Sequence, residues 1–205
     1  MSNTKRVLLI LTVIAVAVGT FLIIRSWFFS QSKVVGVTES ISHPELYLSF
    51  TYPSGEEAYS LIERPGTSES LTHAFIIMKT DEYIALQANQ NEGDAPPAIS
   101  IFVFPEAEPE DVPSTTERAG RITRLQNWAT DNKNLTSIHL AKNTPEVVEL
   151  DGVKSLYYQA DGNFAQEVYL VSYHNNIYMF VGQSQKPTDQ ITTVFKDLIA
   201  SVSFD

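Results

Sequence analysis

The stretch from residue 147 to residue 183 most constrains the fold, because strand-like runs follow one another there with tight-turn residues between them. The runs read VVEL, VKSLYYQA, FAQEVYLVSY and IYMFVGQ. The breaks are Asp151-Gly152, Asp161-Gly162-Asn163 and His174-Asn175-Asn176. Asp, Asn and Gly tolerate the positive φ angles that close hairpins. The sequence therefore predicts a four-stranded antiparallel meander.

Apolar and aromatic residues occupy both faces of the meander strands, as Val168 and Tyr169 illustrate. A sheet with one wet face would carry polar residues on that face. Two amphipathic helices are available to cover the two apolar faces. One begins at a capping box, Ser114 with Glu117, and runs to about Asn132, and the other follows Pro187. We therefore expect an α+β fold in which an antiparallel sheet is sandwiched by helices.

Four more runs in the first half of the chain are strand-like by alternation or by β-branched content. They are residues 46–51, 73–79, 84–89 and 98–104. Breaks rich in Asp, Glu, Gly and Pro separate them. We expect them to pair with antiparallel neighbours.

An uncharged apolar run, VLLILTVIAVAVGTFLII, covers residues 7–24 and lies between Arg6 and Arg25. At ~1.5 Å per residue it reaches about 27 Å, and the aromatic residues up to Phe29 extend it to the thickness of a hydrocarbon core. The alternative is a signal peptide cleaved before Thr20, which would leave FLII exposed on the mature protein. We expect an uncleaved single-pass anchor at residues 7–29 that inserts in the lipid bilayer.

The anchor divides the chain into four parts: a cytoplasmic tail over residues 1–6, the anchor over 7–29, a linker over 30–43 and a domain over 44–205. By the positive-inside rule, Lys5 and Arg6 give a weak preference for a cytoplasmic N-terminus. The expected location is therefore the cell membrane, with the C-terminal domain extracytoplasmic.

Charge separates the anchor from the domain. Residues 1–33 carry four of the 14 Lys and Arg residues and none of the 24 acidic residues, so residues 34–205 have a net charge of −14. Phosphate backbones repel so acidic a domain, and we expect no nucleic acid partner. The chain has no cysteine, which excludes disulfides and thiolate metal sites.

Particular motifs accompany this order of elements. They are YPSG at the end of the first strand, APPAISIFVF at 95–104, LQNWATDN at 125–132, LDGVKSLYY at 150–158 and SVSF at 201–204. In these motifs the chain resembles the PsbP-like family, and most of all its membrane-anchored bacterial members, over roughly residues 44–204. The resemblance implies an antiparallel sheet between helices and a non-enzymatic extracytoplasmic role.

The photosystem members of that family are soluble lumenal proteins that dock through basic surfaces, whereas this chain combines an expected anchor with an acidic domain. The resemblance therefore carries no photosynthetic role to this chain. It carries no binding residue either, because the matched positions are turns and core.

Common catalytic and phosphate-binding signatures are missing from the sequence: it contains no G-x-S-x-G, H-E-x-x-H, G-x-x-x-x-G-K-[ST] or G-x-G-x-x-G. We expect no enzymatic activity and no cofactor. His43, His73, His139 and His174 are far apart in the sequence and have no ligand spacing, so we predict no histidine metal site.

The segment PEAEPEDVP offers Glu106, Glu108, Glu110 and Asp111 as weak candidates for oxygen ligands to calcium. Prolines interrupt the segment, and the glycine turn usual in such sites is absent. We interpret it as a solvated acidic loop.

The meander carries a group of tyrosines, of which Tyr157, Tyr169 and Tyr173 are the candidate binding surface for a peptide or glycan. Paired strands also enrich aromatic residues for packing alone. Core pairing is therefore the competing interpretation.

The leading functional hypothesis is an anchored, non-catalytic domain that binds a protein or cell-surface partner as an accessory or scaffold. The alternative is an anchored hydrolase or cation-dependent enzyme with a carboxylate site. A large pocket with convergent acids or histidines would favour the enzyme, and a shallow aromatic or acidic surface would favour binding.

Overall fold

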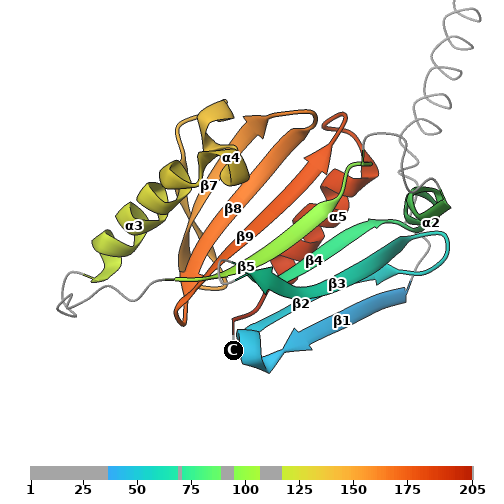
Figure 1. Ribbon diagram of the computed structural model, residues 1–205, viewed down its shortest axis with the longest axis horizontal. Coiled ribbons are helices and arrows are strands. Elements are labelled where there is room, and N and C mark those ends of the chain that lie inside the picture. The colour runs from blue at the N-terminus through green and yellow to red at the C-terminus, as the bar shows by residue number, and fades with distance from the viewer. Residues whose placement is uncertain (1–36, 69–70, 89–94, 107–116, 205) are drawn as a thin grey trace, which may run out of the picture. The chain divides into compact units, whose positions relative to one another are not determined.

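The computed structural model describes residues 37–68, 71–88, 95–106 and 117–204 (Figure 1). The strands are β1 (Val37–His43), β2 (Leu48–Ser54), β3 (Tyr59–Ser68), β4 (Leu71–Lys79), β5 (Ile99–Pro105), β6 (Glu146–Leu150), β7 (Val153–Asp161), β8 (Ala165–Tyr173) and β9 (Asn176–Ser184). The α-helices are α2 (Thr80–Ala88), α3 (Glu117–Asp131), α4 (Lys133–Thr136) and α5 (Gln190–Ser201), with short 3₁₀ turns at Pro44–Leu46 and Ile138–Leu140.

All nine strands form one sheet in the order β1-β2-β3-β4-β5-β9-β8-β7-β6. Neighbours are antiparallel except β2 and β3, which meet in parallel at Ser54 and Tyr59. The predicted meander is confirmed, because β6 to β9 pair successively with their neighbours in the chain. Asp151, His174 and Asn175 have φ angles of 47°, 44° and 59° in the turns, which is the conformation that their residue types tolerate.

Helices cover both faces of the sheet. Leu125 of α3 belongs to one buried cluster with Met179 and Val181 of β9, whereas Phe195 of α5 packs over Gly182 of the same strand. Successive strand residues point to opposite faces, so α3 and α5 lie on opposite sides, as Figure 1 shows. The α+β class and the helices on both sides are confirmed, although the sheet is mixed rather than wholly antiparallel.

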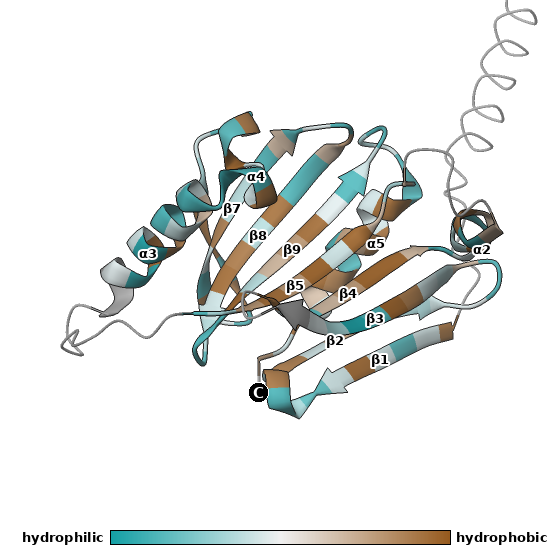
Figure 2. Cartoon of the chain, viewed as in Figure 1, coloured by the Kyte–Doolittle hydropathy of each residue, from teal (hydrophilic) through white to brown (hydrophobic). Residues whose placement is uncertain are grey.

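The hydropathy colouring follows this layered arrangement. In Figure 2 the apolar colour is strongest along the central strands β5, β8 and β9, and the outer surface of α3 is hydrophilic. Burial agrees with it, since Ile99, Leu170 and Tyr178 are fully buried. The core therefore consists of two layers, one on each face of the sheet.

The C-terminal segment joins the edge of β2. Ser49 N donates to Ser203 O and Ser203 N donates to Ser49 O, each at 2.9 Å, and Thr51 N donates to the Ser201 hydroxyl at 2.9 Å. The last residues of the chain therefore hold β2, which pairs with β3 at only one position.

Three elements differ from the sequence-based expectations. Residues 37–43, which the sequence predicts as linker, form β1 and pair with β2 along its whole length. The strand predicted over residues 84–89 is wrong, because residues up to 88 belong to helix α2. Strand β3 is not predicted, and its pairing with β4 shifts register between Pro65 and Ser68.

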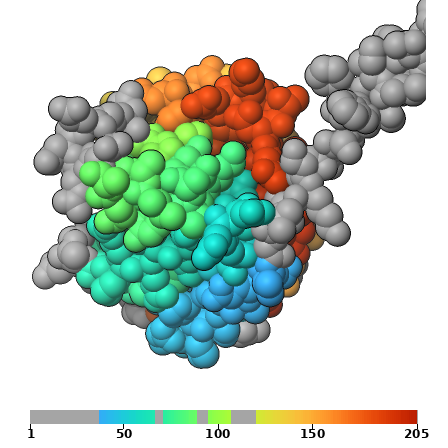
Figure 3. Space-filling model, turned by 90° about the vertical axis from the view of Figure 1, so that its right-hand side faces the viewer, coloured from blue at the N-terminus to red at the C-terminus, as the bar shows by residue number. Residues whose placement is uncertain are grey.

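Helix α2 buries none of its residues, and Ile84 is 61% exposed. Figure 3 shows the green atoms of α2 on the surface of the molecule. Asp81 and Glu82 occupy its first turn, where the helix dipole favours negative charge. Local signals of this kind favour a helix even where the apolar residues alternate.

The predicted anchor at residues 7–29 lies outside the described residues. Over the ranges that the structure describes, no helix is both long enough and apolar enough to span a membrane.

Candidate functional site

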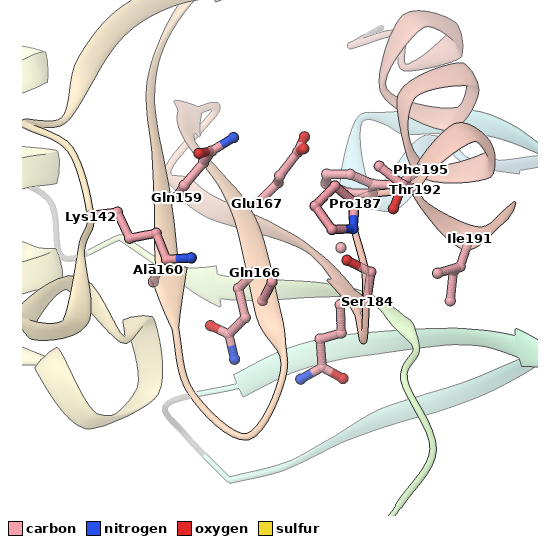
Figure 4. A pocket seen from close by; sticks show the side chains of 13 residues that line it. Lys142, Gln159, Ala160, Gln166, Glu167, Ser184, Pro187, Ile191, Thr192 and Phe195 are labelled. Carbon is pink, nitrogen blue, oxygen red and sulfur yellow. The ribbon is translucent and has the colours of Figure 1, made fainter. Parts of the chain in front are cut away.

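A cavity of about 110 Å³ lies between the first half of α5 and the ends of β7, β8 and β9. Figure 4 shows side chains that line it. We call this cavity the α5 pocket. Its lining includes Gln159, Glu167, Gly182, Pro187, Thr192 and Phe195. One wall is the apolar side of a helix and the opposite wall is polar strand surface.

Strand register places the polar wall. Gln159, Glu167 and Gly182 are partners across β7, β8 and β9, so they share the sheet face that α5 covers. A Cβ at position 182 would lie 2.4 Å from the ring of Phe195, so only glycine allows this close approach of the helix. Gln159 and Glu167 point to the same side of their strands in Figure 4. Both polar side chains therefore face the space beside α5.

The candidate tyrosines 157 and 169 lie next to this pocket. They are register partners, their ring centroids are 4.8 Å apart, and Tyr169 lies 6.0 Å from Phe195. Burial, and then the neighbouring phenol of Tyr157, raise the pKa of Tyr169 to about 12. Burial, followed by the charge of Glu167, raises the pKa of Tyr157. Both rings are therefore neutral phenols at physiological pH, and both are only partly buried.

Tyr173 does not join this pair. It lies four residues further along β8, about 13 Å away at the strand repeat. Its ring contacts His174 at 4.5 Å and Phe204 at 5.2 Å. Of the three candidate tyrosines, the structure brings only Tyr157 and Tyr169 together.

The charges around the pocket are unevenly matched. Lys142, which also lines the cavity, forms an ion pair with Asp161 at 2.7 Å between Nζ and Oδ1. Glu167 is partly buried, and no Lys, Arg or His of the described residues lies within ion-pair distance of it. The sequence prediction missed Glu167. The available signal was a carboxylate on the same face as Tyr169 in a strand that is otherwise largely apolar.

The acidic loop is only partly described. Glu108, Glu110 and Asp111 lie outside the described residues. Glu106 is not solvated, since its side chain is 13% exposed. Its Oε2 accepts a hydrogen bond from the Ser172 hydroxyl, and its Oε1 lies 3.5 Å from Arg124 Nε. The solvated-loop interpretation is therefore wrong for Glu106, which links β5 to β8 and α3.

Two of the histidines, which are far apart in the sequence, lie together in the structure. His73 Nε2 and His43 Nε2 approach the same oxygen, Oε1 of Glu63, at 2.9 Å and 3.3 Å, and the two rings are 5.4 Å apart. His43 Nδ1 also hydrogen-bonds Glu45 at 2.8 Å, which lowers the pKa of that carboxyl. The spacing of the histidines in the sequence gives no sign of this contact, which depends on β1, β3 and β4 meeting at Glu63.

The other histidines are isolated from this cluster. His139 Nδ1 lies 2.9 Å from the carbonyl oxygen of Lys133, and His174 stacks on Tyr47 in a hairpin turn. Among the described side chains, no group of three or more His, Cys, Asp or Glu residues is placed to hold a metal ion.

A second cavity, of about 340 Å³, lies where the turn before β3 meets the start of α2. Tyr59 lines it, and its buried hydroxyl has no hydrogen-bond partner among the described residues. Burial, and then the charges of Glu82 and Asp81, raise the pKa of Tyr59 to about 12. Its lining also includes Glu56, Glu57 and Asp81 with Lys79, so the cavity is mainly acidic.

No protein-family model and no curated protein matches the chain. Solved structures do. The solution structure of cyanobacterial PsbP (CyanoP) from Synechocystis sp. PCC 6803 matches 86% of this chain and 99% of that chain, with a TM-score of 0.50 and 12% sequence identity. A structure from Bacteroides thetaiotaomicron VPI-5482 matches 82% of this chain and 48% of that chain, with a TM-score of 0.44 and 10% identity. The chain has a PsbP-like fold, and the likeness extends to the fold alone.

Proposed function

We propose that this chain is a membrane-anchored protein whose extracytoplasmic PsbP-like domain binds a protein or cell-surface partner without catalysis. The observation that carries the proposal is the α5 pocket with the adjoining pair Tyr157 and Tyr169. Partly buried tyrosines with polar groups beside them are typical of recognition surfaces, because the rings give contact area and the phenols give hydrogen bonds.

The chemistry of the pocket favours binding over hydrolysis. Hydrolysis by a pair of carboxylates needs two titratable groups that converge on one reacting centre. Within the described part of the α5 pocket, Glu167 is the one carboxylate and Lys142 is already paired with Asp161. The cavity is also smaller than the ~300–1,000 Å³ of small-molecule sites. The alternative, an anchored hydrolase or cation-dependent enzyme, also loses Glu106, whose carboxylate is held by Arg124 and Ser172.

The proposed location rests on the sequence. Residues 7–24 carry no charge, and the domain that follows the linker is too acidic to adhere to anionic lipid. An anchor of this kind keeps a binding domain close to a partner in or near the same membrane, which raises their effective concentration.

Site-specific photo-crosslinking in intact membranes tests the proposed surface. A photoreactive amino acid replaces Gln159 in the full chain, and the matched control carries it at Glu149, an exposed residue on the opposite face of the sheet. We expect a discrete adduct from position 159 and none from position 149. Adducts from both positions, or from neither, contradict the proposal.

A further inference from the structure

Glu167 is a partly buried carboxylate that has no counter-charge among the described residues. Its neighbours on the same face are Gln159, Gly182 and the phenol of Tyr169, and Phe195 forms the facing wall. Taking a carboxylate partly out of water costs free energy unless a cation or donors compensate it. No cation among the described residues does so. Lys142, the one lysine that lines the cavity, is paired with Asp161, so Glu167 has no counter-charge of its own among the described residues.

The pair Tyr157 and Tyr169 adds a second attraction for the same charge. A cation within ~6 Å of an aromatic ring is attracted by the electron-rich face, and the effect grows as water is removed. Both rings are neutral phenols at physiological pH, and burial moves their pKa values further from it. Glu146 is the register partner of Tyr157 on β6, so a second carboxylate borders the rings.

The size and charge of the pocket select the occupant. A cavity of about 110 Å³ suits one long side chain rather than a whole small molecule. The net charge of −14 over residues 34–205 attracts basic segments over long range and repels acidic ones. A planar guanidinium can stack on a phenol ring and hydrogen-bond a carboxylate through two N–H groups, which an ammonium cannot.

We infer that the α5 pocket binds an arginine side chain from a basic segment of the protein partner, with its guanidinium between Glu167 and the rings of Tyr157 and Tyr169. This inference rests on the proposed function and names the chemistry of the same site. Gln159 provides a further hydrogen-bonding group at the rim.

Fluorescence anisotropy on the full chain in a neutral detergent tests it. The probe is a labelled peptide of glycines and arginines, compared with the same peptide carrying citrulline, which keeps the shape of arginine but is uncharged. We expect saturable binding of the arginine peptide, at least about tenfold weaker binding of the citrulline peptide, and intermediate binding of a lysine version.

Two charge-matched variants locate the site. Glu167→Gln should weaken the arginine peptide about tenfold, whereas Glu149→Gln, which removes the same charge from the opposite face, should change affinity less than about twofold. Tyr169→Phe keeps the ring and should retain binding, whereas Tyr169→Leu should lose it. Equal effects of the two Glu variants would show general attraction to an acidic surface and overturn the inference.

The result separates the inference from the proposed function. If crosslinking at position 159 captures a partner but the arginine and citrulline peptides bind alike, the surface binds a partner by other chemistry and the inference alone fails. If neither experiment gives a signal, both fail. Thermal unfolding of each variant shows whether the fold is retained.

Discussion

At the scale of single residues, three buried tyrosines differ in what their hydroxyl groups contact. Tyr158 Oη donates to Thr136 O and Tyr178 Oη donates to Leu46 O, each at 2.6 Å. The hydroxyl of Tyr59 has no partner in the part of the chain that the structure describes. Each paired hydroxyl joins a strand to a segment distant in the sequence. The same residue type therefore stabilises the fold at two positions and carries an uncompensated polar group at the third.

Phenylalanine substitutions test this difference. Tyr158→Phe should lower the free energy of unfolding by about 1–2 kcal/mol, because it leaves the Thr136 carbonyl without its donor. Tyr59→Phe should leave stability unchanged or raise it by up to about 1 kcal/mol, because it removes a buried hydroxyl without a partner. Urea unfolding of both variants measures the difference. An equal loss of stability in the two would mean that the Tyr59 hydroxyl has a partner in solution.

Two glutamates make a second comparison. Glu106→Gln should cost about 1–3 kcal/mol, because Arg124 loses its counter-charge at a partly buried position. Glu167→Gln should leave stability unchanged or raise it, because it removes an unpaired carboxylate. Thermal unfolding at a single pH measures both variants. A cost at Glu167 as large as that at Glu106 would argue that a cation already compensates Glu167.

Alkaline pH tests the buried phenols. Burial is the main cause that raises the pKa values of Tyr52, Tyr59 and Tyr169 to about 12, against ~10 in the unfolded chain. Above pH ~10 the unfolded state therefore binds fewer protons than the folded state, and stability falls as pH rises towards 12. Phenolate absorbance followed through a pH titration should show a group of tyrosines that ionise only as the protein unfolds. Complete titration near pH 10 with the fold intact would refute the burial of these rings.

At the scale of elements, local chemistry explains which parts could be predicted. The meander follows from Asp151-Gly152 and His174-Asn175, because those residues themselves adopt the turn conformation. Strand β1 has no such signal, since its polar residues join the sheet only through pairing with β2. Ile84 and Leu86 alternate like strand residues but lie on an exposed helix. Propensity alone does not decide such segments.

One part of the candidate site could likewise be predicted from the sequence, and another part could not. The pairing of Tyr157 with Tyr169 follows from the hairpin register, so a tyrosine surface could be predicted. The place of Phe195 could not, because it depends on where α5 crosses the sheet. The meeting of His43 with His73 likewise depends on tertiary placement, since no spacing in the sequence encodes it.

A double-mutant cycle tests the contact between α5 and β9. Gly182→Ala should cost more than about 2 kcal/mol, because the new Cβ would lie 2.4 Å from the ring of Phe195. Phe195→Ala should cost about 3–5 kcal/mol, because it removes a fully buried ring and leaves a cavity in its place. The double variant should cost less than the sum, since alanine at 182 fills part of that cavity. Additive costs in urea unfolding would mean that the two residues do not touch.

At the scale of the whole molecule, the sequence combines an apolar run with a strongly acidic remainder of the chain. Residues 34–205 have a net charge of −14, and anionic lipid headgroups repel so acidic a segment. The basic residues of the chain's first part lie on both sides of the apolar run, as Arg6 and Arg25 show. This distribution is compatible with the proposed single-pass anchor.

The anchor leads to the last prediction, which is that the chain purified from membranes keeps the residues before Thr20. The run over residues 7–24 continues past Thr20 without a polar segment, so cleavage there would leave FLII and the following WFF exposed to water. Burying those side chains in lipid is favourable by roughly 25 cal/mol per Å² of apolar surface. Intact-mass measurement of the membrane-extracted protein should therefore give the full chain, with or without its first methionine. A mature form that begins at or near Thr20, recovered from the soluble fraction, would replace the anchor with a signal peptide and would leave the binding domain unattached.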